Sequence, residues 1–136
     1  MCGAGQKECA LSKVPMISIV DDDRSLREAT KGLVRSFGYG ADAFASAEEF
    51  LQSDRVNDSS CLILDVNMPG LSGIELQDQL IAQGNHMPII FVTAVHEEAT
   101  RAKALKAGAV GFLSKPFREE WLIDRLDVAL KRDKTD

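Results

Sequence analysis

Short apolar runs alternate along this chain with segments in which apolar residues recur at helical spacing. The runs Met16–Val20, Cys61–Val66 and Pro88–Thr93 are almost continuously apolar. That pattern is typical of strands buried on both faces of a parallel sheet. Two shorter runs, Ala41–Ala45 and Ala109–Leu113, complete a set of five predicted strands.

A segment of helical periodicity follows each predicted strand. The expected helices are Ser25–Phe37, Ser46–Leu51, Ile74–Ala82, Glu98–Ala107 and Arg118–Lys131. Capping boxes are expected to open the first two, at Ser25-x-x-Glu28 and Ser46-x-x-Glu49. Five strands alternating with five helices predict right-handed crossovers and an α/β fold, a doubly wound parallel sheet with helices on both faces.

The 136 residues fit one compact domain. We expect this domain to span residues 15–132, with a flexible N-terminal extension over residues 1–14 and a C-terminal tail over residues 133–136. The first 13 residues lack the features of a signal peptide. No run approaches the about 20 apolar residues of a membrane span, so no membrane association is expected.

The net charge and the cysteines limit which partners and which cellular compartment we expect. A net charge of −5 and a pI near 5.0 argue against direct nucleic-acid binding by this segment, because phosphate binding needs a concentrated basic surface. The three cysteines are odd in number and lack metal-ligand spacing. A cytoplasmic location is the simplest prediction, with Cys61 as a small core residue.

Polar residues stand where the predicted strands end. Asp21 and Asp22 follow the first strand, Asp65 lies near the end of the third, Thr93 closes the fourth and Lys115 lies just past the fifth. The carboxyl ends of parallel strands meet at one edge of a sheet, where open α/β folds bind their ligands. The sequence therefore predicts a site at this edge.

The carboxylates suggest the chemistry of that site. Asp21 and Asp22 repel each other unless a cation is present, and Mg2+ prefers such oxygen ligands. Taken alone, such an acidic run more often marks the N-terminus of the following helix, where the helix dipole favours it. Asp65 interrupts an apolar strand, where a carboxylate is costly to bury without a partner. Beside a metal it could attack phosphorus and form an aspartyl phosphate, with Lys115 offsetting the charge that develops.

Thr93 and Lys115 are weaker signals. Threonine is common in strands, but a hydroxyl at this edge could donate to a phosphoryl oxygen once one is attached. The alternative for Lys115 is an exposed loop lysine. It precedes Pro116, and an X-Pro bond adopts the cis form far more readily than other peptide bonds, which would help to aim the lysine inward.

Together these motifs resemble response-regulator receiver domains of two-component (phosphorelay) signalling, of the nitrogen-fixation regulator type. The matching pieces are IVDDD followed by RSLRE, LDVNMPGLSG, IIFVTA and FLSKPF, in the family's order, and they span about Met16 to Lys131. The resemblance implies a flavodoxin-like sheet with strand order 2-1-3-4-5. It also implies Asp65 as phosphoacceptor, Mg2+ held by Asp21, Asp22, Asp65 and the backbone carbonyl of Asn67, and Thr93 and Lys115 in contact with the phosphoryl group.

The resemblance further implies a partner and a switch. A sensor histidine kinase supplies the phosphoryl group, which draws Thr93 inward and lets the aromatic ring of Phe112 turn. This reshapes the face made by the fourth helix, fifth strand and fifth helix, through which a homodimer could form. Many relatives have tyrosine at this switch position, so any contact made by its hydroxyl is absent here. Val95 is apolar where some relatives carry polar groups near the attacking water, which suggests slow self-dephosphorylation. Asp23 is assigned a supporting role.

The last predicted helix has a second apolar flank. Leu122, Leu126, Ala129 and Leu130 form one stripe, whereas Trp121 and Val128 fall elsewhere. The two residues either form a partner face, for dimerisation or kinase docking, or merely pack on a neighbouring element.

Two other functions would also suit this fold. An aspartate-nucleophile, Mg2+-dependent phosphohydrolase uses an Asp-x-Asp-x-Thr signature, but Asn67 replaces the second acid and the nucleophile candidate follows the third strand. A receiver-like binding module that works without phosphorylation would not need all five chemical positions, and all five are present. Both alternatives rank below the receiver.

Overall fold

The computed structural model describes residues 14–94 and 97–134. Its centre is a five-stranded sheet in the order β3-β2-β4-β5-β6, in which every neighbouring pair is parallel. The strands are Met16–Val20 (β2), Gly40–Phe44 (β3), Cys61–Asp65 (β4), Ile89–Thr93 (β5) and Gly111–Ser114 (β6). In chain order this is the predicted arrangement 2-1-3-4-5, so the flavodoxin-like fold class is confirmed.

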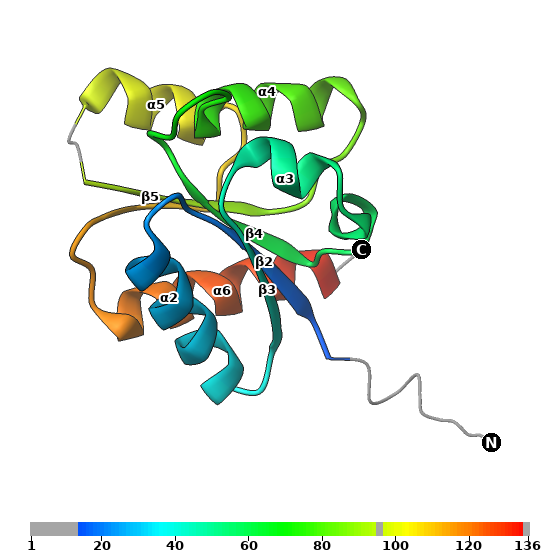
Figure 1. Cartoon of the computed structure of the whole chain (residues 1–136), viewed down its shortest axis with the longest axis vertical. Helices are drawn as coiled ribbons and strands as arrows, with labels where there is room; N and C mark the ends of the chain where they lie inside the picture. The colour runs from blue at the N-terminus through cyan, green and yellow to red at the C-terminus, as the bar shows by residue number, and fades with distance from the viewer. Residues whose placement is uncertain (1–13, 95–96, 135–136) are drawn as a thin grey trace.

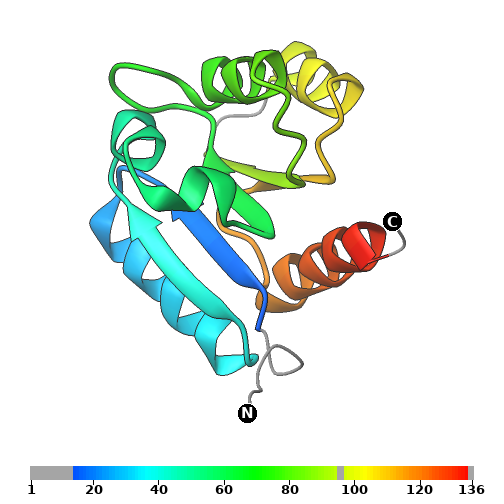
Figure 2. The ribbon, with the colours of Figure 1, turned by 90° about the vertical axis from the view of Figure 1, so that its right-hand side faces the viewer.

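Helices cover both faces of the sheet (Figure 1). The helices are Arg24–Ser36 (α2), Ala47–Leu51 (α3), Gly73–Ala82 (α4), Glu98–Lys106 (α5) and Glu119–Lys134 (α6). One face carries α3, α4 and α5 and the other carries α2 and α6, as the view turned by 90° also shows (Figure 2). All five predicted helices are present.

A short 3-10 helix, Asp54–Asn57 (η2), was not predicted. It lies between α3 and β4, in a segment for which the sequence pattern predicted neither helix nor strand. The Arg55 guanidinium holds it in place, with Nε 2.6 Å from Asp42 Oδ2 and Nη1 2.7 Å from Asp58 Oδ2. Because Asp42 is remote in sequence, this contact could not be predicted from local pattern.

The predicted capping box at the start of α2 is wrong. The N-cap is Asp23, whose carboxylate accepts a hydrogen bond from the Leu26 amide at 3.2 Å, and Ser25 lies inside the helix. Aspartate is as good an N-cap as serine, and Asp23 lies two residues before Ser25, so the helix begins at Arg24. The structure thus gives Asp23 a capping role.

The other helix starts differ in detail. The Ser46 hydroxyl caps α3 as predicted, but the Glu49 carboxylate accepts from the amide of Ala45 rather than from that of Ser46. A complete capping box opens α4 instead, between Ser72 and Glu75. Apolar periodicity alone missed it because the first turn of α4 begins with glycine.

Each face of the sheet packs against one apolar layer. One layer joins the sheet to α3, α4 and α5, with Phe50, Leu76 and Leu80 fully buried. The other joins it to α2 and α6. The predicted stripe of α6 faces this second layer, where Leu122, Leu126 and Ala129 are fully buried and Leu130 is nearly so. Burial on both faces explains why the central strands are almost continuously apolar.

No helix within residues 14–94 and 97–134 is long and apolar enough to cross a membrane.

The first residue of α4 packs against the end of β4. The Gly73 amide donates to the Val66 carbonyl at 2.9 Å. A Cβ atom at position 73 would run into the backbone carbonyl oxygen of Asp65. Glycine is therefore needed here for close approach, and the backbone around Asp65 depends on it.

We expect Gly73→Ala to destabilise the protein by about 1–3 kcal/mol, because the added methyl group overpacks this contact. Gly32→Ala is the matched control, since nothing lies within 4 Å of a Cβ at that helical position. It should stabilise by about 0.5–1 kcal/mol through helix propensity. Urea unfolding measures both, and equal effects of the two substitutions would contradict the close contact.

Candidate functional site

Asp21 lies directly after β2 and is held from several sides. Its amide donates to the Phe44 carbonyl at 3.1 Å, and its carboxylate accepts from the Asp23 amide at 2.9 Å. The Arg27 guanidinium donates to the Asp21 carbonyl at 3.0 Å. Arg27 was not singled out in the sequence, because its contact is with backbone rather than with a side chain. These bonds orient a carboxylate that is 3% exposed.

Lys115 joins two of the predicted carboxylates. Its Nζ atom is 3.2 Å from Asp21 Oδ2 and 3.5 Å from Asp65 Oδ1. Its amide donates to the Thr93 carbonyl at 2.7 Å, and its peptide bond to Pro116 is cis. The lysine is mostly buried, so the alternative of an exposed loop lysine is wrong.

Three carboxylates gather beside this lysine. Asp21, Asp22 and Asp65 each offer an oxygen, and these oxygens lie within 4.8 Å of one another. Asp21 and Asp65 are buried and Asp22 is exposed. The group carries more negative than positive charge, and its donors are all oxygens. A small hard cation fits such a donor set.

The pKa of Asp65 reflects its burial among these charged groups. Burial raises the pKa of its carboxyl group from 3.8 to about 6, against the opposing effect of Lys115. The neighbouring carboxylates of Asp21 and Asp22 contribute smaller upward effects to this value. Ionised Asp65 is thus unfavourable in the protein alone, and a bound cation would favour it.

Thr93 lies at the same edge of the sheet. Asp65 pairs in register with Val92, which places Thr93 one residue beyond it at the end of β5. Thr93 is 1% exposed. The side-chain amide of Asn67 reaches the Thr93 hydroxyl at 3.5 Å, so this loop residue after β4 contacts the neighbouring strand end.

Phe112 lies on the adjacent strand, away from the carboxylates. It pairs in register with Phe91, and the two ring centroids are 6.0 Å apart. A cavity of about 190 Å³ adjoins it, between β6 and the start of α5, lined by Glu97, Glu98, Arg101, Phe112 and Ser114. The half-buried ring of Phe112 therefore has open space beside it.

Trp121 and Val128, the two residues predicted as a partner face on α6, lie outside the core. Trp121 is 48% exposed, and the Arg118 guanidinium lies 5.7 Å from the centroid of its ring. Val128 is half-buried. Val95, on which the expectation of slow self-dephosphorylation rests, lies outside the described residues.

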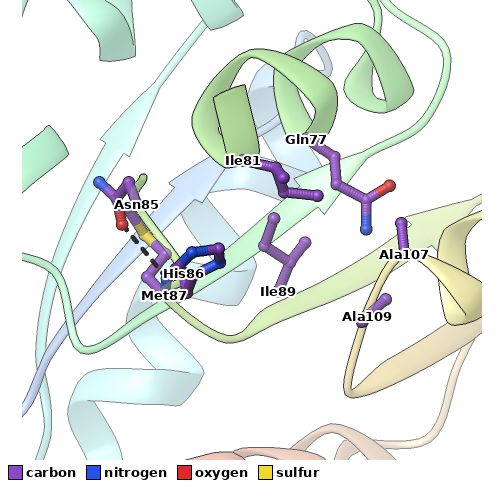
Figure 3. Close-up of a pocket in the computed structure, with 9 residues that line it drawn as sticks. Gln77, Ile81, Asn85, His86, Met87, Ile89, Ala107 and Ala109 are labelled. Carbon is purple, nitrogen blue, oxygen red and sulfur yellow. Dashed lines mark hydrogen bonds between the residues drawn. The ribbon is translucent and has the colours of Figure 1, made fainter. Parts of the chain in front are cut away.

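A second pocket lies at the amino end of β5 (Figure 3), and none of the three carboxylates lines it. It has a volume of about 220 Å³ and lies among α4, the start of β5 and the segment between α5 and β6. Gln77 lines it, with Nε2 donating to the Ala104 carbonyl at 3.1 Å. Exposed His86 contributes to the opposite wall (Figure 3). The predicted functional residues are all absent from this pocket.

Comparison with known proteins agrees with this geometry. Residues 17–127 match the family described as "Response regulator receiver domain". The chain is 44% identical over 119 residues to nodulation protein W of Bradyrhizobium diazoefficiens, covering 88% of this chain and 52% of that protein. It is 36% identical over 116 residues to transcriptional regulatory protein FixJ of Azorhizobium caulinodans, covering 85% and 55%.

The fold is also similar to solved structures. The structure of response regulator StyR matches with a TM-score of 0.84 and 42% identity, over 90% of this chain and 62% of that one. The chain thus spans about half the length of the curated relatives reported above. The similarity to FixJ agrees with the predicted resemblance to regulators of the nitrogen-fixation type. With its acidic cluster at the carboxyl edge of the sheet, the chain belongs to the response regulator receiver domain family of two-component signalling.

Proposed function

We propose that this receiver accepts a phosphoryl group on Asp65 from a phosphohistidine of a sensor histidine kinase. The observation that carries the proposal is the buried Asp65 carboxylate, 4% exposed, at the end of β4 beside the lysine and two further carboxylates. In the transfer, an Asp65 carboxylate oxygen bonds to phosphorus. The bond between phosphorus and the histidine nitrogen breaks, and the nitrogen keeps the electron pair.

The neighbouring residues have separate roles in this proposal. Asp21, Asp22, Asp65 and the backbone carbonyl of Asn67 hold Mg2+. When bound, Mg2+ supplies positive charge that stabilises the transferring phosphoryl group. Lys115, 3.5 Å from Asp65, neutralises further charge, and the Thr93 hydroxyl donates to a phosphoryl oxygen.

The protein acts as a phosphoacceptor that catalyses its own phosphorylation and, slowly, its own dephosphorylation. The residue two positions after Asp65 is Asn67, which cannot act as a general acid or base. This supports a single transfer rather than the repeated turnover of a phosphohydrolase.

Phosphorylation also operates a switch in this proposal. The phosphoryl group draws the Thr93 hydroxyl away from Asn67, and Phe112 moves within the open space beside its ring. The change shifts the population between two packings of the face formed by α5, β6 and α6. Half-exposed Trp121 and Val128 extend this face on α6, where they bind a second copy of the chain or the kinase.

The receiver occupies residues 15–132 in this proposal, with residues 1–14 and 133–136 as flanking segments. It works in the cytoplasm, where a buried thiol such as that of Cys61 stays reduced.

Incubation with Mg2+ and acetyl phosphate tests the phosphoacceptor. We expect one phosphoryl group per chain by mass spectrometry, none in Asp65→Asn, and uptake slowed about 100-fold or more in Lys115→Ala. Asp78→Asn, an exposed carboxylate on α4, is the matched control and should react normally. Continuous phosphate release would instead indicate a phosphohydrolase, and no uptake by the unaltered protein would indicate a binding module.

The raised pKa of Asp65 predicts a pH-dependent stability. The folded protein holds this proton more tightly than the unfolded chain does, so its stability falls as pH rises from about 4 to about 6. Above this range the ionised Asp65 carboxylate lowers the free energy of unfolding by up to about 3 kcal/mol. Without Mg2+, Asp65→Asn should therefore stabilise the protein at about pH 7.5 but have little effect at about pH 4, as measured by urea unfolding. An equal effect at both pH values would be inconsistent with the raised pKa.

Sedimentation with and without beryllofluoride, a phosphoryl mimic, tests the switching face. We expect beryllofluoride to promote self-association of the unaltered chain. Thr93→Ala, which uncouples the switch, and Trp121→Ala, which removes an anchor, should each weaken self-association about fivefold or more. Phe37→Ala is the control, because Phe37 is a similarly exposed aromatic residue that caps the C-terminal end of α2 and is not part of α6. Trp121 is not part of the face if Trp121→Ala leaves both self-association and kinase affinity unchanged.

A further inference from the structure

We propose that Glu48 is a positioning residue for the metal site. Its carboxylate holds the loop between β4 and α4 in the conformation that presents the Asn67 carbonyl beside Asp65. This inference rests on the proposed function, because it assigns a role to a residue that approaches the site through its loop and touches neither metal nor phosphoryl group.

The contact joins α3 to the loop. Glu48 Oε2 accepts a hydrogen bond from the Leu71 amide at 3.1 Å. Gly70, next to Leu71, has a φ of +76°. A Cβ atom there would lie 2.7 Å from Glu48 Oε2. The carboxylate therefore rests against the bare Cα of Gly70, and glycine provides both the room and the backbone conformation.

The helix that carries Glu48 is firmly anchored. Ala47 and Phe50, on either side of it in sequence, are both 0% exposed. They belong to the same apolar layer as Val66 and Met68, which flank Asn67. The carboxylate thus reaches the loop from an element that cannot shift without disturbing the core.

Other hydrogen bonds also hold the loop between β4 and α4, but they lie at its ends. At the far end, the Gly73 amide bonds to the Val66 carbonyl at 2.9 Å, and Ser72 forms the capping box with Glu75. Nearer the middle of the loop, the Glu48 carboxylate of α3 accepts a hydrogen bond from the backbone amide of Leu71, next to Gly70. Its loss would loosen the loop while leaving the strand and helix on either side in place.

Small changes in this loop matter for a magnesium site. Mg2+ demands near-octahedral geometry, so a backbone carbonyl is useful as a ligand only when its direction is well defined. Groups that orient a metal ligand from outside the site change affinity without binding the metal themselves. We therefore expect weaker Mg2+ binding without Glu48, rather than its loss.

Glu49 provides a matched comparison. Like Glu48, it is an exposed glutamate in the first turn of α3. The two residues therefore match in charge and in exposure. Its Oε1 atom accepts from the Ala45 amide at 3.1 Å, a contact local to the start of the helix. A difference between Glu48 and Glu49 variants would thus isolate the contact with the loop.

Titration calorimetry of the full chain with Mg2+ tests the inference. Glu48→Ala should raise the dissociation constant about threefold to tenfold, the effect of losing one hydrogen bond that orders the site. Glu48→Gln, which keeps an acceptor, and Glu49→Ala should stay within about twofold of the unaltered chain. Backbone 15N order parameters of Gly70 and Leu71 should fall from about 0.85 toward 0.6 in Glu48→Ala alone.

Several outcomes would overturn the inference. Equal dissociation constants for Glu48→Ala and Glu49→Ala would show that the loop contact does not matter. Equal weakening in Glu48→Gln and Glu48→Ala would show that charge, not the hydrogen bond, is responsible. If the unaltered chain neither binds Mg2+ nor takes up a phosphoryl group, the proposed function fails instead. The order parameters then still decide whether Glu48 holds the loop.

Discussion

The interaction on which the site depends is that between the buried Asp65 carboxylate and the Lys115 ammonium group. Asp65 ends the strand that lies between β2 and β5 in the sheet, where it is largely buried and its charge is poorly solvated. Lys115 lowers the pKa of this carboxyl group, but burial raises it more, and the value reaches about 6. The folded protein therefore maintains an unfavourable charge at a position where a bound cation or an electrophile would relieve it.

The rest of the fold supplies the rigidity that this arrangement needs. Two apolar layers fix the strands, and the strand ends then carry the polar groups on short connections. These connections are held by bonds to backbone: Arg27 to the Asp21 carbonyl, and the Gly73 amide to the Val66 carbonyl. In our proposal Glu48 does the same for the loop after β4. A stable core and an electrostatically strained edge are thus separate parts of one domain.

Sequence pattern predicted the elements well because each strand is buried on both faces, which leaves a strong apolar signal. It predicted that the polar residues gather at one sheet edge, as they do, because parallel strands bring their ends together whatever the details of their packing. Prediction failed where neighbouring residues compete for one role. Asp23 and Ser25 are both good N-caps, and the Asp23 carboxylate makes the bond to the Leu26 amide. It also failed for η2, whose position depends on the contact between Arg55 and Asp42.

The sequence by itself determined the fold class, the order in which chemical groups reach the sheet edge, and the family to which the chain belongs. These follow from apolar periodicity and from residue types at strand ends, which are local properties of the chain. The tertiary structure alone decided the distances from Lys115 to Asp21 and Asp65, the raised pKa of Asp65, and the reach of Glu48 to Leu71. Each of these features depends on burial or on contact between segments that are far apart in the sequence. Both arise only when the chain folds.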